Sequence, residues 1–311
     1  MRKRLEERVN TYGSYLKRRY GVRTFRIGLS INRDCPHRKK SGGCIFCSPE
    51  SFTDRRLAGN LEVKQQIETL LPDIRQGCGR VALLAYFHNE TSTAGELDYL
   101  KHIFSETLKH NEIKGLIIST RPDYLNKDIM EMLKELKGDI FLEIGLQSIH
   151  QESLDFLKRG HTVQDFAAAA ELCSRYDIET GVHLIIGIPG ETREHMIRTV
   201  NYLNNLEIVR QIKFHNLVVY KNTELSGYSR EILDSIPDIE EYIATLAIVL
   251  QHTRSDKVIS RLFTSNVNRD GRALNSFPGL KRSWLNRLSG YLNENDIIQG
   301  TATGVPYNPV N

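Results

Sequence analysis

Short apolar segments alternate with longer stretches of helical periodicity through the middle of this chain. Six of the apolar segments are rich in Val, Ile and Leu, and they span residues 25–31, 81–87, 115–119, 140–146, 182–188 and 212–219. The helical stretches between them span residues 61–71, 96–109, 126–137, 163–175 and 192–206. Because strands and helices alternate, the pattern predicts βα units and a parallel sheet, either doubly wound or curled into a barrel.

Polar and glycine-containing sequences follow the carboxyl ends of these strands. They lie at residues 32–35, 88–93, 119–123, 147–148 and 187–192. In α/β barrels the active site is built at this end of the strands. We therefore predict an α/β fold, a partial (β/α)6 barrel of the TIM-like kind, with the functional residues gathered at one end.

The two ends of the chain differ from the middle. Residues 4–20 predict an amphipathic helix, because apolar residues recur at spacings of four and three: Leu5, Val9, Tyr12 and Leu16. Beyond residue 221 the pattern predicts a helix, a strand and a helix, near residues 238–253, 258–263 and 279–292. We divide the chain into a basic N-terminal helix, a barrel and a C-terminal extension, at residues 1–24, 25–221 and 222–311.

The composition favours a cytoplasmic protein with no membrane partner. The chain has 311 residues, of which 40% are apolar, and this length is enough to bury a substantial core. No apolar run is long enough to cross a bilayer, and the basic first residues lead into further charged residues rather than an apolar stretch. Five cysteines with three clustered fit metal binding in a reducing compartment better than a disulfide framework.

The positive charge is concentrated at the two ends. Residues 1–40 hold thirteen Lys and Arg against three Asp and Glu, whereas the whole chain has a net charge of only +4. Residues 254–287 hold eight Lys and Arg against two Asp. Two basic regions on an otherwise acidic body indicate a site for a phosphate backbone. A solvated charged surface explains the same charges, and charge alone does not decide between the two.

Three cysteines, Cys35, Cys44 and Cys47, lie in one short loop after the first strand. Thiolates bind zinc, copper(I) or iron–sulfur clusters, and three ligands without a fourth leave one coordination position open. Structural zinc is the alternative, with His37 as the fourth ligand of a Cys3His set. The predicted barrel favours a catalytic centre over zinc, because a structural zinc loop does not need a barrel mouth. Cys78 and Cys173 lie in segments typical of ordinary packing.

The spacing C-x8-C-x2-C, with Phe46 before the last cysteine, resembles the cluster loop of the radical SAM superfamily. The long first gap is similar to the branch related to the elongator catalytic subunit, which acts on tRNA. The resemblance covers roughly residues 10–290, through the segments 118–123, 142–148, 158–161 and 183–191. The chain resembles a bacterial stand-alone member without the acetyltransferase domain.

The resemblance implies a [4Fe-4S] cluster on the three cysteines and S-adenosylmethionine (SAM) on the open iron. It implies catalysis through a 5′-deoxyadenosyl radical, with an electron from a protein such as flavodoxin or ferredoxin. Residues of the matching segments are implied in SAM binding: Phe46, Asn89, Ser119, Glu143, Gln147, Arg159, His183 and Ile188. For Arg159 the implied partner is the methionyl carboxylate, and for Ile188 it is the adenine through main-chain groups. His183 replaces an expected acidic residue, and a packed core histidine is the alternative for this position.

Substrate contacts are predicted on and after the sixth strand. Lys213 and His215 share one face of it, and Tyr220 follows it. The alternative is that they are ordinary alternating strand residues. Three arginines of the C-terminal basic region are expected to bind phosphates together with the N-terminal helix: Arg261, Arg269 and Arg272. Three tyrosines of that helix could stack on bases, although packing explains Tyr12 equally well: Tyr12, Tyr15 and Tyr20.

The sequence therefore predicts a radical SAM enzyme that acts on a tRNA base, such as a modified wobble uridine. Two alternatives stay open: a radical SAM enzyme for a small metabolite, and a zinc-stabilised RNA-binding protein without catalysis.

Overall fold

The computed structural model describes residues 3–51, 54–57, 61–78, 81–264 and 271–308. Arg269, one of the predicted phosphate-binding arginines, lies outside these ranges. The side chain of Cys78 is also outside the described part of the structure.

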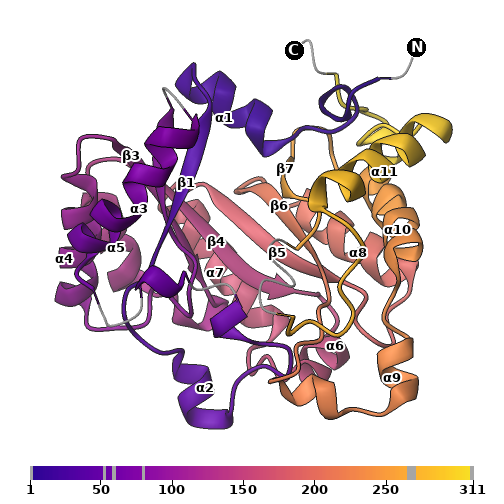
Figure 1. The fold of residues 1–311 in the computed structure, drawn as a ribbon, viewed down its shortest axis with the longest axis horizontal. Coiled ribbons are helices and arrows are strands. Elements are labelled where there is room, and N and C mark those ends of the chain that lie inside the picture. The colour runs from indigo at the N-terminus through magenta and orange to yellow at the C-terminus, as the bar shows by residue number, and fades with distance from the viewer. Residues whose placement is uncertain (1–2, 52–53, 58–60, 79–80, 265–270, 309–311) are drawn as a thin grey trace.

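A seven-stranded sheet forms the centre of the molecule, and its strands follow one another in chain order (Figure 1). Every neighbouring pair is parallel. The strands are β1 (Thr24–Leu29), β2 (Ala82–Phe87), β3 (Ile113–Thr120), β4 (Asp139–Gln147), β5 (Thr180–Ile186), β6 (Val209–Asn216) and β7 (Val258–Arg261). Because β1 and β7 are the two edges of the sheet, the curled sheet stays open along one side.

Helices connect the strands and cover the outer face of the sheet. The α-helices are α1 (Tyr12–Tyr20), α2 (Pro36–Ser41), α3 (Val63–Cys78), α4 (Leu97–Leu108), α5 (Lys127–Glu135), α6 (Gln151–Phe156), α7 (Val163–Arg175), α8 (Arg193–Asn204), α9 (Arg230–Asp234), α10 (Ile239–His252) and α11 (Lys281–Glu294). Short 3-10 turns lie at Leu5–Glu7, Pro49–Ser51, Arg55–Leu57, Pro122–Tyr124, Glu224–Gly227 and Thr301–Thr303.

The predicted partial α/β barrel is confirmed, with one strand more than the six expected. Val258–Arg261, which the sequence analysis assigned to the C-terminal extension, pairs in parallel with β6 and becomes β7. The division of the chain into three parts stays a prediction.

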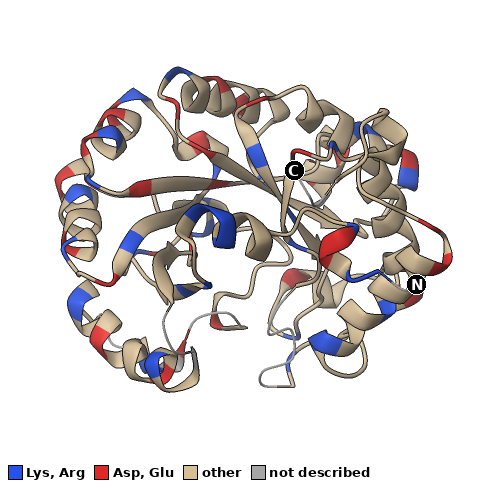
Figure 2. Ribbon diagram, turned by 90° about the horizontal axis from the view of Figure 1, so that it is seen from above, with Lys and Arg blue, Asp and Glu red and all other residues tan. Residues whose placement is uncertain are grey.

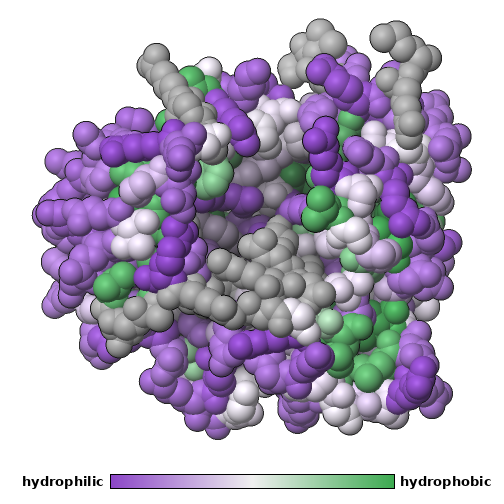
Figure 3. All heavy atoms as spheres, viewed as in Figure 1, coloured by the Kyte–Doolittle hydropathy of each residue, from purple (hydrophilic) through white to green (hydrophobic). Residues whose placement is uncertain are grey.

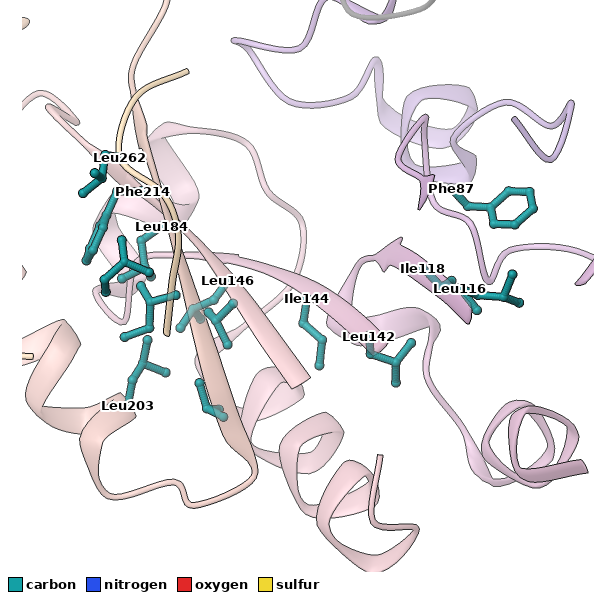
Figure 4. Close-up of a cluster of buried hydrophobic side chains, with 14 of the residues drawn as sticks. Phe87, Leu116, Ile118, Leu142, Ile144, Leu146, Leu184, Leu203, Phe214 and Leu262 are labelled. Atoms are coloured by element: carbon teal, nitrogen blue, oxygen red, sulfur yellow. The ribbon is translucent and has the colours of Figure 1, made fainter. Parts of the chain in front are cut away.

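The main core lies between the outer face of the sheet and the helices. Outward-facing residues of β2 to β6 fill it together with residues of the covering helices, as Figure 4 shows for Ile118, Ile144, Leu184, Leu203 and Phe214. Strands buried on both faces are typical of a parallel sheet covered by helices. Because the main apolar core lies on the outer face, the inner face can carry polar side chains, and these line the barrel lumen.

The predicted helix at residues 4–20 is interrupted. The structure forms a 3-10 turn at Leu5–Glu7 and begins α1 at Tyr12, after Thr11 as N-cap. The backbone carbonyl of Asn10 accepts a hydrogen bond from Ile259 N at 2.7 Å. This strand-like contact with β7 occupies a backbone group that a continuous helix would need for itself.

Helix α1 closes the barrel at the amino ends of the strands. Tyr12 and Leu16 pack against Ile117 and Phe141 inside this end. Arg19 binds Asp139, the first residue of β4, at 3.0 Å. Figure 2, seen from the top of Figure 1, shows α1 and its basic residues across this end of the barrel.

The two ends of the chain pack together. Arg8 is buried, donates to the carbonyl oxygen of Ile297 at 2.9 Å and pairs with Asp296 at 3.1 Å.

Among the helices of the described segments, we find no stretch with both the length and the apolarity needed to cross a bilayer.

Candidate active site

The eight residues between Cys35 and Cys44 form a short helix and a glycine turn. Cys35 is the N-cap of α2, and Pro36 occupies its first position, where a missing N–H costs nothing. Gly42 and Gly43 follow the helix with φ values of +82° and +88°, a conformation that other residues rarely adopt. The long spacing is therefore filled by regular structure rather than by a loose loop.

Each thiol lies beside a polar side chain: Cys35 beside Thr91 Oγ1 at 3.3 Å, Cys44 beside Arg159 Nη1 at 3.1 Å and Cys47 beside Arg38 Nη2 at 3.7 Å. Glu90, in the loop after β2, links two of these positions. Its carboxylate accepts two hydrogen bonds from Arg38, at 2.7 and 3.0 Å, and one from the backbone N–H of Cys35 at 3.0 Å. The cysteine loop is thus held to the carboxyl end of β2.

Two neighbouring guanidinium groups, those of Arg38 and Arg159, lower the pKa values of the thiols that they contact. Burial raises the pKa of Cys44, but the positive charge of Arg159, together with His37 and Arg121, outweighs burial and brings the pKa down to about 7. Burial raises the pKa of Cys47 to about 12, and the neighbouring Cys44 thiolate adds to this effect. Since thiolates bind iron, three thiols in one loop, two of them beside Arg38 and Arg159, fit an anionic iron–sulfur cluster.

His37, the histidine of the alternative zinc site, lies close enough to Cys44 to lower the pKa of this thiol, but both of its ring nitrogens also lie against other groups. His37 Nε2 lies 2.7 Å from the carbonyl oxygen of Lys158, and Nδ1 lies 3.0 Å from the hydroxyl of Ser41. Within the described ranges, no three His, Cys, Asp or Glu side chains converge as ligands of a single metal ion. The hydrogen bonds of His37 thus count against its role as a fourth zinc ligand.

Between the cysteine loop and the amino ends of the strands, a buried ion pair crosses the barrel lumen. Lys213 from β6 donates to Glu143 from β4, and the side chains of both are at most 2% exposed. Glu143 Oε2 also accepts from His183 at 2.9 Å and from Ser119 at 3.1 Å. Lys213 donates to the hydroxyl of Tyr86 at 2.6 Å. Five strands of the sheet, β2 to β6, are thereby connected through their inner faces.

The Glu143–Lys213 pair affects the protonation states of the neighbouring side chains in the lumen. Burial alone would raise the pKa of Glu143, but the charge of Lys213 lowers it well below its usual range. Burial and the charge of Lys213 lower the pKa of His183 to about 4. His183 is therefore neutral at neutral pH, and Glu143 is ionised. Glu143 Oε1 is buried and has no hydrogen-bond partner in the described structure, which leaves it available to a ligand.

A cavity of about 640 Å³ runs through this lumen. Cys47 and Asn89 line it at the cysteine loop, His183 lies along it, and Arg26 and Arg261 line it at the edge strands β1 and β7. Figure 3, viewed as Figure 1, shows this face of the molecule hollowed near its centre, with hydrophilic side chains around the hollow. The cavity joins the thiols to the open side of the barrel.

Residues 29–203 match the model of a protein family described as the radical SAM superfamily. The match covers more than half of the chain and includes all three cysteines of the loop. The chain belongs to the radical SAM superfamily.

Three similarities place this radical SAM chain among known proteins. An uncharacterized protein of Methanocaldococcus jannaschii is 32% identical over 93% of this chain and 90% of its own length. A tRNA uridine(34) acetyltransferase of Methanocaldococcus infernus is 31% identical over 82% of this chain, which spans 53% of that enzyme. The solved structure of Elp3 from Methanocaldococcus infernus shares the fold, with a TM-score of 0.66 and 17% identity over 89% of this chain and 64% of that one.

The predicted SAM-binding residues lie around the radical SAM cysteine loop and in the barrel lumen next to it. Asn89, Gln147 and Phe46 line the cavity, and the buried Asn89 Oδ1 lacks a hydrogen-bond partner among the described residues. Arg159 contacts Cys44 and donates to the carbonyl oxygen of Gly145 at 2.9 Å, and its expected contact with the SAM carboxylate stays a prediction. The carbonyl oxygen of Ile188, expected near adenine, accepts from the N–H of Glu191 at 3.0 Å within its own turn.

The predicted substrate residues divide into two groups. His215, Tyr220 and Arg261 line the cavity, and His215 lies next to His183 with ring centroids 5.3 Å apart. The ammonium group of Lys213 binds Glu143 and Tyr86, and its role as a substrate residue stays a prediction.

Outside the cavity, the remaining candidates are engaged in contacts of their own. Arg272 pairs with Glu50. Tyr12 is buried, and the hydroxyls of Tyr15 and Tyr20 donate to carboxylates at the closed end of the barrel, so packing is the better account of the three tyrosines.

Several residues of the site were missed from the sequence. Arg26, Tyr86 and His88 face the lumen, and their alternation with outward apolar residues in the first two strands was the signal that could have found them. Arg38 and Glu90 could not be found in this way, because their contact joins positions 52 residues apart.

Proposed function

We propose that this protein is a radical SAM enzyme that holds a [4Fe-4S] cluster on Cys35, Cys44 and Cys47 and modifies a tRNA base, a wobble uridine. The observation that carries the proposal is the cysteine loop at the carboxyl end of the barrel, with guanidinium groups on two of its thiols. This end of a barrel is where catalytic groups are found.

The cluster with bound SAM would supply the single electron and the 5′-deoxyadenosyl radical. The chain's own residues position and protect this chemistry. Arg38 and Arg159 offset the negative charge beside the thiols, and Glu90 holds the loop against β2. The Glu143–Lys213 pair fixes the polar wall of the lumen without water between its members. Asn89 Oδ1 and Glu143 Oε1 remain as buried acceptors for the amino or hydroxyl groups of SAM.

Iron content tests the cluster assignment. Anaerobically purified protein should be brown, contain about four irons per chain and release methionine from SAM after reduction. Alanine at Cys35, Cys44 or Cys47 should abolish the visible absorbance and the SAM cleavage. Cys173→Ala is the matched control, since Cys173 is a free thiol buried in α7, and it should keep both. Colourless protein with one zinc would contradict the proposal.

The tRNA substrate is supported by the similarity to proteins named tRNA uridine(34) acetyltransferases. Nucleosides of tRNA from cells with and without the protein should then differ at one modified uridine. Identical nucleoside profiles would leave the radical SAM chemistry standing and contradict the tRNA substrate.

A small metabolite is the second candidate substrate. The cavity volume of about 640 Å³ lies within the range of pockets that enclose small molecules. Salt-sensitive tRNA binding by the purified protein favours tRNA, and its absence favours the metabolite. For the electron, we propose a small cytoplasmic donor such as flavodoxin or ferredoxin.

A further inference from the structure

The cavity carries two arginines that the cysteine loop and the ion pair do not use. Arg26 extends from β1 and Arg261 from β7, so the two edge strands of the open barrel each contribute one guanidinium group to the same cavity. Arg26 lies between the rings of Tyr12 and Tyr86, with 5.5 Å from its guanidinium carbon to each ring centroid. The two aromatic rings therefore hold the guanidinium group in place before any ligand arrives.

The acidic side chains of the cavity wall are already engaged. Asp54 and Asp73 both pair with Arg56, at the rim. Glu143, which lies in the lumen but does not line the cavity, pairs with Lys213 and His183.

Arg26 and Arg261 thus lack a carboxylate partner in the described parts of the chain. Arg26 Nη1 is buried and has no hydrogen-bond partner there, and the same holds for Nε2 of His215 in the same cavity. Burial lowers the pKa of Arg261, and the positive charge of Arg26 adds to this effect. Two half-buried positive charges that face one cavity without a carboxylate partner are costly, and an anion between them would offset the cost.

We propose that Arg26 and Arg261 bind an anionic group of the substrate, a carboxylate or a phosphate, with His215 as a third polar contact. This inference rests on the proposed function, because it names the chemistry of the molecule on which the radical would act. Guanidinium groups bind carboxylates and phosphates in a fixed orientation. Since Cys47 lines the same cavity, a substrate anchored at the edge strands extends toward the cysteine loop.

Anion binding by the cluster-loaded protein tests the proposal. Inorganic phosphate and acetate are titrated calorimetrically at low ionic strength into the wild type and into two variants, Arg26→Gln and Arg261→Gln. We expect at least one anion to bind, and each variant to weaken binding at least tenfold. The anion that binds more tightly identifies the group as a phosphate or a carboxylate. Arg56→Gln is the matched control, because Arg56 lines the same cavity but is paired with two aspartates, and it should stay within twofold of the wild type.

The outcomes separate this inference from the proposed function. If neither anion binds, or if binding survives both substitutions, the anion site is wrong. Loss in Arg56→Gln as well would also overturn it, because the effect would then be one of overall charge. Cleavage of SAM by the wild type is measured in the same samples and tests only the radical SAM chemistry. Since Arg26 also packs on two tyrosines, Arg261→Gln provides the independent test if Arg26→Gln unfolds.

Discussion

At the scale of single residues, the buried Glu143–Lys213 pair makes the sharpest energetic prediction. Removing one member leaves the other buried without its partner, which costs about 3–5 kcal/mol in comparable pairs. We expect Glu143→Gln and Lys213→Met each to lower the free energy of unfolding by about this amount. The double variant should lose less than the sum of the two, because no unpaired charge remains.

Urea unfolding of the four proteins at neutral pH measures this coupling. Strictly additive losses would mean that the two side chains contribute independently, in contradiction to their direct contact.

His88 predicts how stability depends on pH. Burial and the charges of Lys213 and Arg261 lower its pKa to about 3, whereas an unfolded histidine takes up a proton near pH 6.5. Between these values the unfolded chain binds more protons than the folded one, so the stability present at pH 7 falls as the pH decreases. At pH 5 this one histidine accounts for a loss of about 2 kcal/mol.

Urea unfolding at pH 7 and pH 5 checks this value. His88→Gln should reduce the loss between the two pH values by about 2 kcal/mol. His102→Gln, at an exposed position on α4, should keep the wild-type loss. An unchanged loss in His88→Gln would show that other groups carry the pH dependence.

At the scale of elements, Gly160 joins the turn after α6 to the cysteine loop. Its φ is +63°, and a Cβ there would lie 2.6 Å from Cε1 of His37 in α2. Gly21, after α1, has a φ of +71° and open space around a Cβ. Gly21→Ala should therefore cost about 1–2 kcal/mol from backbone strain alone. Gly160→Ala should cost about 1–3 kcal/mol more, because His37 must move.

Thermal or urea unfolding gives both values, and iron per chain shows whether the loop is displaced. Equal losses and equal iron in the two variants would mean that α2 accommodates the extra methyl group freely.

The helices also show which parts of the fold could be predicted from the sequence alone. The boundaries of α7 were predicted to the residue, because Thr162 and Asp165 form a capping box before an apolar stripe. Helix α2 was missed, because a helix of six residues is too short to show helical periodicity, although Pro36 and Gly42 mark its ends. Asn89 was predicted at the end of a strand, and the structure places it on the wall of the cavity. Glu143 and Lys213 were each named as candidates, but their ion pair was not predicted, because it joins two side chains that are distant in sequence.

At the scale of the whole molecule, the two ends of the barrel carry different elements and different charged groups. The basic helix α1 lies across the amino ends of the strands, whereas the cysteine loop and α2 lie at the carboxyl ends, on the opposite side of the molecule (Figure 1). The concentration of charge in residues 1–40 is therefore divided between two distant surfaces. Apart from Arg26, which lines the cavity from β1, only the part carried by α2 and its neighbours lies beside the candidate active site.

This division changes which lysines should bind tRNA. Lys40 of α2 and Lys17 of α1 are both exposed and both lie on short basic helices. If a tRNA base reaches the lumen from the carboxyl end, Lys40→Glu should weaken tRNA binding several-fold. It should also reduce the slope of log K against log salt by about 1, as expected for one lost phosphate contact. Lys17→Glu, the same substitution at the closed end, should leave affinity and slope unchanged. Filter binding at several salt concentrations measures both quantities, and the opposite ranking would mean that tRNA docks across α1, away from the cysteine loop.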